Sequence, residues 1–125
     1  MLKSSRRSLT ILLIDDEPAI LSLNRALFET LGYSVLTAGS GDEALTAMQG
    51  HPIDAVVLDY MMPTMDGEET ARRIRRAHSN VPIVISSAWE SLPGRLLEIA
   101  DAAVDKGRGL AALIREVEKL LPPVN

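Results

Sequence analysis

The sequence predicts an α/β fold, a doubly wound five-stranded parallel sheet of strand order 2-1-3-4-5 flanked by five helices. Short apolar runs alternate with segments of helical periodicity along the whole chain. The strongest runs are rich in Leu and β-branched residues and almost unbroken in hydrophobicity, which is typical of strands that helices cover on both faces. Because crossover connections are right-handed, few doubly wound sheets fit such a chain, and one of them has this order.

The elements follow one another in a regular rhythm. Strands are expected at residues 10–14, 33–38, 55–58, 82–86 and 102–105, and helices at residues 18–31, 40–50, 66–78, 92–100 and 109–121. The first helix has Pro18 at its start, apolar residues at three- and four-residue spacing, and Gly32 just past its end. The last helix repeats this pattern and stops at Pro122. The fourth helix is predicted to be short or displaced.

Length and composition indicate one compact domain. With 125 residues and 46% hydrophobic composition, the chain is long enough for one real core. We expect this domain at residues 9–122, between a flexible basic tail at residues 1–8 and a C-terminal end at residues 123–125.

Charge and composition also exclude several classes of function. The chain has 13 basic and 17 acidic residues, so it lacks the strongly basic field of a general nucleic-acid binder, and direct DNA binding is not expected. No apolar stretch is long enough to cross a membrane and no signal core follows the basic start, which predicts a cytoplasmic protein without a membrane partner. The absence of Cys excludes disulfides, thiolate nucleophiles and Cys-based zinc sites.

Acidic residues end two strands that the predicted order makes neighbours. Asp15 and Asp16 follow the first strand, and Asp59 ends the third. In an open parallel sheet, functional groups gather at the carboxyl ends of the strands. Crowded carboxylates raise each other's pKa unless a cation compensates, and their hard oxygen atoms favour Mg²⁺ or Mn²⁺. Lys106 ends the fifth strand and could bring a positive charge to the same edge.

These groups match the needs of phosphoryl transfer to a carboxylate: a nucleophilic Asp, a divalent ion and fixed donors for the transferring oxygen atoms. Asp59 is the expected nucleophile because it ends the central strand. A hydroxyl could come from Ser86 or Ser87, since strand alternation points only one of them at the crevice. Counting from Pro82 favours Ser87. Asp15 or Asp16 alone could instead be a helix N-cap before Pro18, but the adjacent pair together with Asp59 argues against caps only.

At this point the chain resembles the receiver domain of two-component response regulators, which has a flavodoxin-like fold. The stretches that carry the resemblance are "LLIDDEP", "VVLDYMMPTMDGEE", "VPIVISSA" and the Lys of "AVDK". The resemblance implies that Asp59 accepts a phosphoryl group from a sensor histidine kinase or phosphotransfer protein. It also implies that Asp16, Asp59 and the backbone carbonyl of Met61 hold Mg²⁺ with help from Asp15. Ser87 would bond a phosphoryl oxygen and Lys106 would pair with the phosphate.

Three departures fall on the region that receiver domains use for output. Ala103 occupies a position that is commonly aromatic in the family, Gly107 follows Lys106 in place of Pro, and the stretch from Ser87 to Lys106 is short. The expected function is therefore a phosphoacceptor that signals through protein contacts or acts as a phosphoryl relay or sink. A receiver-like docking module that needs no phosphate is the alternative. A magnesium-dependent phosphatase is disfavoured, because no second acid/base carboxylate follows Asp59 closely.

The third predicted helix carries a run of arginines whose role the sequence leaves open. The simplest interpretation is a solvated helix face, and a docking surface for an acidic partner is the alternative. The residues concerned are Arg72, Arg73, Arg75 and Arg76.

Overall fold

The computed structural model describes residues 9–62, 65–88 and 94–122. Its elements are β1 (Thr10–Ile14), α2 (Pro18–Thr30), β2 (Ser34–Ala38), α3 (Gly41–Gly50), β3 (Ala55–Asp59), β4 (Met61–Met62), β5 (Met65–Asp66), α4 (Gly67–Ala77), β6 (Ile83–Ser87), α5 (Gly94–Ile99), β7 (Ala102–Asp105), a 3₁₀ turn (Lys106–Arg108) and α6 (Leu110–Leu120). The basic tail at residues 1–8 and the end at residues 123–125 lie outside the described residues, so the domain boundaries stay predictions.

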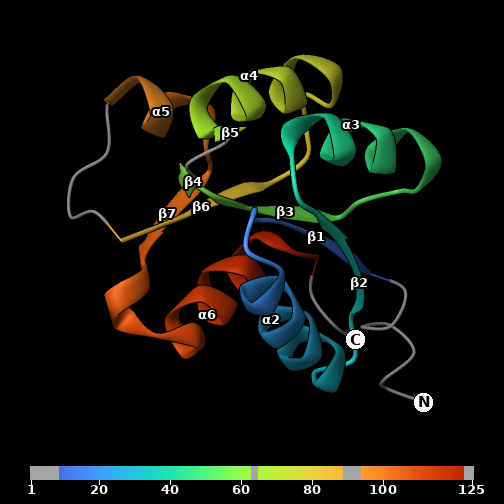
Figure 1. Cartoon of the computed structure of the whole chain (residues 1–125), viewed down its shortest axis with the longest axis vertical. Helices are drawn as coiled ribbons and strands as arrows, with labels where there is room; N and C mark the ends of the chain where they lie inside the picture. The colour runs from blue at the N-terminus through green and yellow to red at the C-terminus, as the bar shows by residue number, and fades with distance from the viewer. Residues whose placement is uncertain (1–8, 63–64, 89–93, 123–125) are drawn as a thin grey trace.

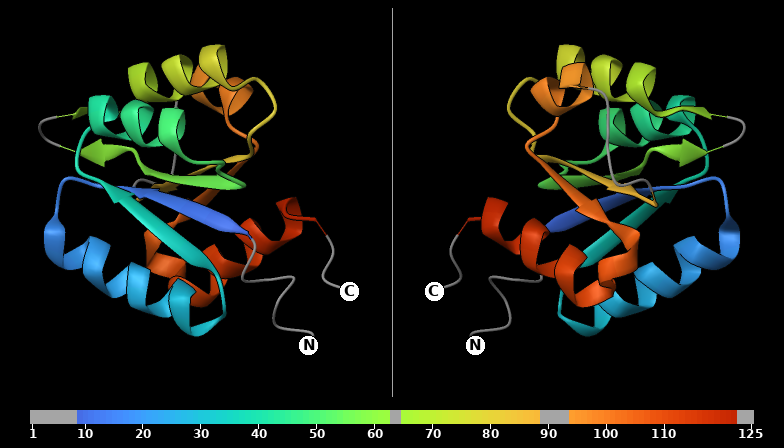
Figure 2. Two further views of the ribbon diagram at one scale, coloured as in Figure 1. Left: turned by 90° about the vertical axis from the view of Figure 1, so that its right-hand side faces the viewer. Right: turned by 90° about the vertical axis from the view of Figure 1, so that its left-hand side faces the viewer.

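The five main strands form one parallel sheet in the order β2-β1-β3-β6-β7. This order is the predicted 2-1-3-4-5 arrangement, which the structure confirms. Helices α3, α4 and α5 cover one face of the sheet, and α2 and α6 cover the other (Figures 1 and 2). Successive strand residues alternate between the two faces, so Leu12 and Val56 belong to one apolar core and Leu13 and Val57 to the other.

Local sequence signals set the ends of α2. Glu17 has an extended backbone at the N-cap, and Pro18, whose missing N–H needs no partner there, occupies the first turn. At the other end, Gly32 has a φ of 101°, a left-handed conformation that glycine adopts without steric cost. The chain can then turn directly into β2, as the sequence predicts.

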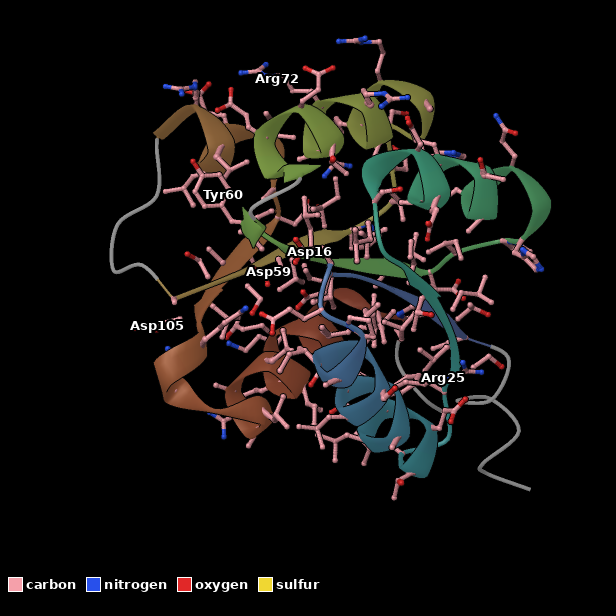
Figure 3. All side chains as sticks on the ribbon, in the orientation of Figure 1. Asp16, Arg25, Asp59, Tyr60, Arg72 and Asp105 are labelled. Carbon is pink, nitrogen blue, oxygen red and sulfur yellow. The ribbon has the colours of Figure 1, made fainter. Side chains whose placement is uncertain are left out.

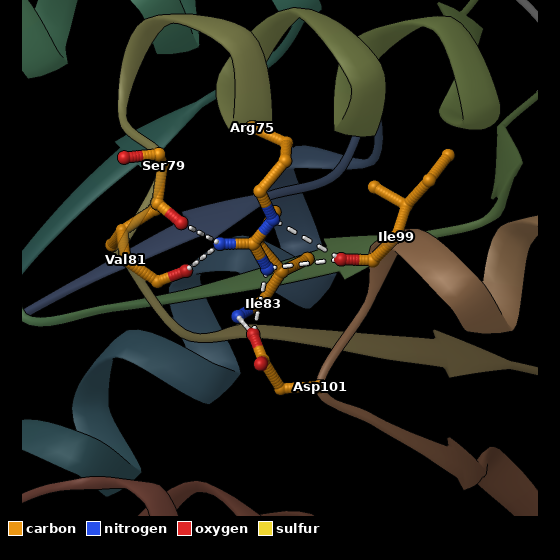
Figure 4. Close-up of polar contacts among 6 residues, drawn as sticks. All are labelled: Arg75, Ser79, Val81, Ile83, Ile99 and Asp101. Atoms are coloured by element: carbon orange, nitrogen blue, oxygen red, sulfur yellow. Dashed lines mark hydrogen bonds and ion pairs between the residues drawn. The ribbon is translucent and has the colours of Figure 1, made fainter.

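Helix α5 is six residues long, which confirms the predicted short fourth helix. Side chains of α4 hold both of its ends. Near its start, Arg95 donates to Glu68 at 2.9 Å. At its end, Arg75 donates to the carbonyl oxygen of Ile99 at 2.9 Å and pairs with Asp101 at 2.7 Å (Figure 4). Helices α4 and α5 are thus linked as a unit.

Arg75 therefore differs from the solvated face that the sequence suggests. It lies half-buried and also donates to the carbonyl oxygens of Ser79 and Val81, at 2.9 and 2.7 Å. Five N–H donors in a rigid fork allow one guanidinium to join several carbonyl groups. The prediction of a solvated face is wrong for Arg75, whereas Arg72 and Arg76 are exposed.

Two features near the sheet were not predicted. A small antiparallel hairpin, β4 with β5, follows β3 directly. After β7, a 3₁₀ turn begins at Lys106, and the Asp105 carboxylate accepts the N–H of Gly107 at 2.8 Å to cap it. Across the described ranges of the chain, no helix is both long and apolar enough to span a membrane.

Candidate functional site

The candidate site lies at the carboxyl edge of the sheet, where β1, β3, β6 and β7 end side by side. The register pairs Ile14 of β1 with Leu58 of β3, so Asp15 and Asp59 come next to each other. Figure 3 labels Asp16, Asp59 and Asp105 at this edge. The crossovers therefore bring together acidic residues that are far apart in the sequence.

Asp59 and Lys106 form the central contact. The Lys106 Nζ atom lies 2.7 Å from Asp59 Oδ2. The side chain of Asp59 is 5% exposed and that of Lys106 is 36% exposed. Asp59 is the buried member of this ion pair. Its carboxylate depends on the lysine, because a buried charge without a partner strongly destabilises the fold. The structure thus brings these two predicted site residues into contact, while their roles stay predictions.

Asp15 is the second buried carboxylate of the site. Its Oδ1 accepts the backbone N–H of Glu17 at 3.0 Å, which resembles a capping contact, although Glu17 and not Asp15 is the N-cap of α2. The pKa of Asp15 is raised to about 6, chiefly by burial and in smaller part by the neighbouring Asp59, while the Glu17 N–H and the Lys106 ammonium act in the opposite direction. Asp15 and Asp59 therefore share a pocket with less positive charge than they require.

Asp16 is placed differently. It is half-buried and does not line the small hollow that Asp15 and Asp59 share. Within the described ranges, no group of three or more His, Cys, Asp or Glu side chains is arranged to hold a metal ion. The backbone of Met61 begins β4, two residues after Asp59. The structure thus joins two of the predicted metal ligands, and the parts assigned to Asp16 and the Met61 carbonyl stay predictions.

The oxygen atoms of this site are nevertheless the ligands that a hard cation prefers. Asp15 and Asp59 are both at most 5% exposed, and they supply carboxylate oxygen atoms only. One lysine offsets one of the two charges. A divalent cation would remove the remaining repulsion, and carboxylates with carbonyl oxygens are suitable ligands for Mg²⁺.

The two adjacent serines of β6 occupy opposite faces of the sheet. Ser86 pairs with Asp59 in register and lines the hollow that contains Asp15, Asp59 and Lys106. Ser87 is 1% exposed, pairs in register with Asp105 and does not line that hollow. The sequence offered either serine as the hydroxyl donor and favoured Ser87, whose role stays a prediction.

Two hollows adjoin beneath the site. The smaller, about 30 Å³, lies among β1, β3, β6 and α2. The larger, about 190 Å³, lies between α2 and α6 and has mostly apolar walls that include Leu23 and Leu110. Asn24, Ser86 and Lys106 line both. Asn24 is a site residue that sequence analysis missed, although its place one turn after Ile20 puts it on the helix face that covers the sheet.

Two residues that depart from the family pattern lie in β7 and in the 3₁₀ turn that follows it. Ala103 is exposed on β7, the edge strand of the sheet. Gly107 lies in the 3₁₀ turn that Asp105 caps. A Cβ added at Gly107 would lie 3.3 Å from Asp105 Oδ1, so this capped turn is tight.

The fold and this edge of the sheet define a doubly wound α/β domain with a buried acidic pair opposed by one lysine. Residues 11–117 match the family described as the response regulator receiver domain. This match covers most of the chain, and the chain belongs to that family.

Relatives among characterised sequences are longer than this chain. A probable transcriptional regulator ycf27 of Cyanidium caldarium is 39% identical over 90 residues, which is 72% of this chain and 36% of that protein. The response regulator MprA of Mycobacterium sp. (strain KMS) is 36% identical over 114 residues, 89% of this chain and 50% of that protein. The chain spans half the length, or less, of these two relatives.

Solved structures agree with the assignment. The response regulator protein TrrA of Thermotoga maritima, in complex with Mg²⁺-BeF, is 33% identical with a TM-score of 0.82, covering 90% of this chain and 99% of that one. The same protein in complex with the histidine kinase ThkA gives a TM-score of 0.82 over 91% of this chain and 99% of that one, again at 33% identity.

Proposed function

We propose that Asp59 is a phosphoacceptor that takes a phosphoryl group from a phosphohistidine of a sensor histidine kinase or a phosphotransfer protein. The observation that carries this proposal is the buried Asp59 carboxylate, which lies 2.7 Å from the Lys106 ammonium at the end of the central strand of a receiver fold. TrrA, which is similar to this chain, has been solved with a histidine kinase.

The transfer needs little covalent chemistry from the protein. One Asp59 oxygen attacks phosphorus, an O–P bond forms, the P–N bond breaks, and its electron pair returns to the imidazole nitrogen. Lys106 would pair with a phosphoryl oxygen and offset the added charge, and Ser87 would donate a hydrogen bond to another. Positioning and charge stabilisation account for the rate.

Mg²⁺ suits the donors of this site, and Mn²⁺ has the same preference for oxygen ligands. Asp16, Asp59 and the Met61 carbonyl would hold the ion, with Asp15 assisting. When bound, the ion supplies positive charge to the transferring phosphoryl oxygen atoms. The complex of TrrA with Mg²⁺-BeF supports this assignment.

The output is a change of protein contacts or a further phosphoryl transfer. The acyl phosphate adds charge and acceptor oxygen atoms, which bias a two-state arrangement of the neighbouring loops. The domain, at residues 9–122, would catalyse only its own phosphorylation and dephosphorylation, in the cytoplasm and without contacting DNA or a membrane itself. Of the longer relatives, ycf27 carries the name of a probable transcriptional regulator and MprA that of a response regulator.

A phosphate-independent docking module is the second candidate. Ala103 and Gly107 depart from the family pattern, and α5 is short and linked to α4. Both observations favour an output face that does not switch in the usual manner.

Intact mass spectrometry tests the proposal. The protein is incubated with acetyl phosphate and Mg²⁺, alongside an EDTA sample, Asp59→Asn, and Asp42→Asn as a control carboxylate that pairs with Arg73 outside the site. We expect one added phosphoryl group in the wild type and Asp42→Asn, and none in the other two samples. A folded wild type that gains no mass, from acetyl phosphate or from a phosphorylated kinase, would support the docking module.

A further inference from the structure

Ser86 has a buried hydroxyl whose place in the site no family motif explains. Its neighbours Val84 and Ile85 belong to the two opposite cores, so strand alternation sends Ser86 to the face of Asp59 and Lys106. The residue is 8% exposed. Its carbonyl oxygen accepts the N–H of Tyr60, but no protein group in the described ranges bonds its hydroxyl.

An unsatisfied buried hydroxyl needs an explanation. Leaving such a group without a partner costs roughly 1–3 kcal/mol, and native proteins contain few of them. Ala or Val would fit an apolar strand at lower cost. A serine here therefore indicates that its hydroxyl finds a partner in the working protein.

The hollow beneath Asp59 supplies room and further polar groups. Its volume of about 30 Å³ is enough for one water molecule, which requires two to four polar partners. Asn24 of α2 lines it from the opposite side, and its amide likewise makes no hydrogen bond to the described part of the chain. Ser86 and Asn24 thus line one small space together with the Lys106 side chain.

Lys106 has donors to spare. An ammonium group has three N–H donors, and within the described part of the chain the hydrogen bond of Lys106 Nζ goes to Asp59. When Asp59 becomes an acyl phosphate, its carboxylate charge moves to the phosphoryl oxygen atoms. The ammonium then pairs with a phosphoryl oxygen, and acceptors for its remaining N–H donors would keep it at the same place.

We propose that Ser86 is a positioning residue of the phosphoryl site, whose hydroxyl, with Asn24 and one water molecule held between them, keeps the Lys106 ammonium in place during transfer to Asp59. This inference rests on the proposed function. It separates the two serines: Ser86 acts on Lys106 from within the sheet, whereas Ser87 is the predicted donor to the phosphate.

The test compares wild type, Ser86→Ala and Ser86→Thr, which keeps the hydroxyl. The rate of phosphorylation by acetyl phosphate is measured over a range of donor concentrations with Mg²⁺. We expect Ser86→Ala to lower the maximal rate about fivefold, the factor given by one hydrogen bond of about 1 kcal/mol. The half-saturating concentration should not change, and Ser86→Thr should restore the rate.

A second readout follows the ammonium itself. The chain has three lysines, Lys3, Lys106 and Lys119, so the Hε resonances of Lys106 can be assigned in ¹³C-lysine spectra. In the wild type, a held side chain should give two distinct Hε shifts, which merge in Ser86→Ala and separate again in Ser86→Thr. Lys119 is the internal control, because its contact is with Glu116.

The outcomes distinguish the two proposals. A wild type that is not phosphorylated overturns the proposed function and this inference with it. A phosphorylated wild type with an unchanged rate in Ser86→Ala overturns the inference alone. The same holds if the Ala variant is slow while its Lys106 resonances are unchanged, or if Ser86→Thr stays slow, because either result indicates packing.

Discussion

Replacing Asp15 with Asn should stabilise the protein at neutral pH when divalent cations are absent. The Asn side chain keeps an oxygen that can accept the Glu17 N–H, but it removes the buried charge beside Asp59. The pKa of Asp15 rises from 3.8 to about 6. At about 1.4 kcal/mol per unit, this rise of roughly two units means that ionised Asp15 lowers the free energy of unfolding by about 3 kcal/mol.

The sign of the pH dependence follows from the direction of this shift. Between about pH 4 and pH 6, the folded protein binds more protons at Asp15 than the unfolded chain does, so its contribution to stability falls as pH rises. The loss of stability caused by ionised Asp15 is complete above its pKa in the folded protein and absent below its pKa in the unfolded chain. The gap between Asp15→Asn and wild type should therefore be near zero at pH 4 and about 3 kcal/mol at pH 7.5.

Urea unfolding in EDTA at these two pH values measures the gap directly, because other titrating groups are shared by the two proteins. Adding Mg²⁺ should reduce the difference in stability between the two proteins, because the ion should stabilise the wild type more than Asp15→Asn. A variant that is less stable than wild type at pH 7.5, or a gap of equal size at both pH values, would show that the buried charge of Asp15 is not destabilising.

Further predictions concern the helices that cover the sheet. Arg75→Lys keeps the charge but not the five-donor fork that reaches three carbonyl groups, so urea unfolding should show a loss of about 2 kcal/mol, and equal stability would contradict the role of the fork. Gly41→Ala would place a Cβ 2.6 Å from Thr70 Oγ1, which should cost about 1–3 kcal/mol. Gly50→Ala meets nothing within 4 Å and should be neutral or stabilising. Arg95 and then Arg72 hold the pKa of Glu68 below its usual value, which shows that both arginines favour the charged carboxylate. Glu68→Gln removes this charge and should weaken the link to α5. Hydrogen exchange should then become faster in α5 and stay unchanged in α6.

The sequence predicted the sheet because its information is local and repeated. Alternating apolar and amphipathic segments with right-handed crossovers leave few strand orders. The same logic predicted the meeting of Asp15, Asp59 and Lys106, since each follows or ends a strand of the sheet.

The features that sequence analysis missed depend on contacts between distant segments. The choice between Ser86 and Ser87 depends on the register of β3 with β6, which neither strand encodes alone. In the sequence, Arg75 is one of several arginines on a basic helix. Its half-buried position depends on the carbonyl oxygens of Ile99 and Val81, which belong to other segments of the chain. The hairpin of β4 and β5 has two residues in each strand, too few for a periodic pattern.

The residue that carries the phosphoryl group can be identified chemically. An aspartyl phosphate formed with acetyl phosphate and Mg²⁺ can be reduced by borohydride to homoserine, and peptide mapping then locates that residue. We expect homoserine at position 59 and aspartate at Asp15, Asp16 and Asp54. Homoserine at another acidic position, or none at position 59 in protein that has gained the phosphoryl mass, would show that Asp59 is not the phosphoacceptor.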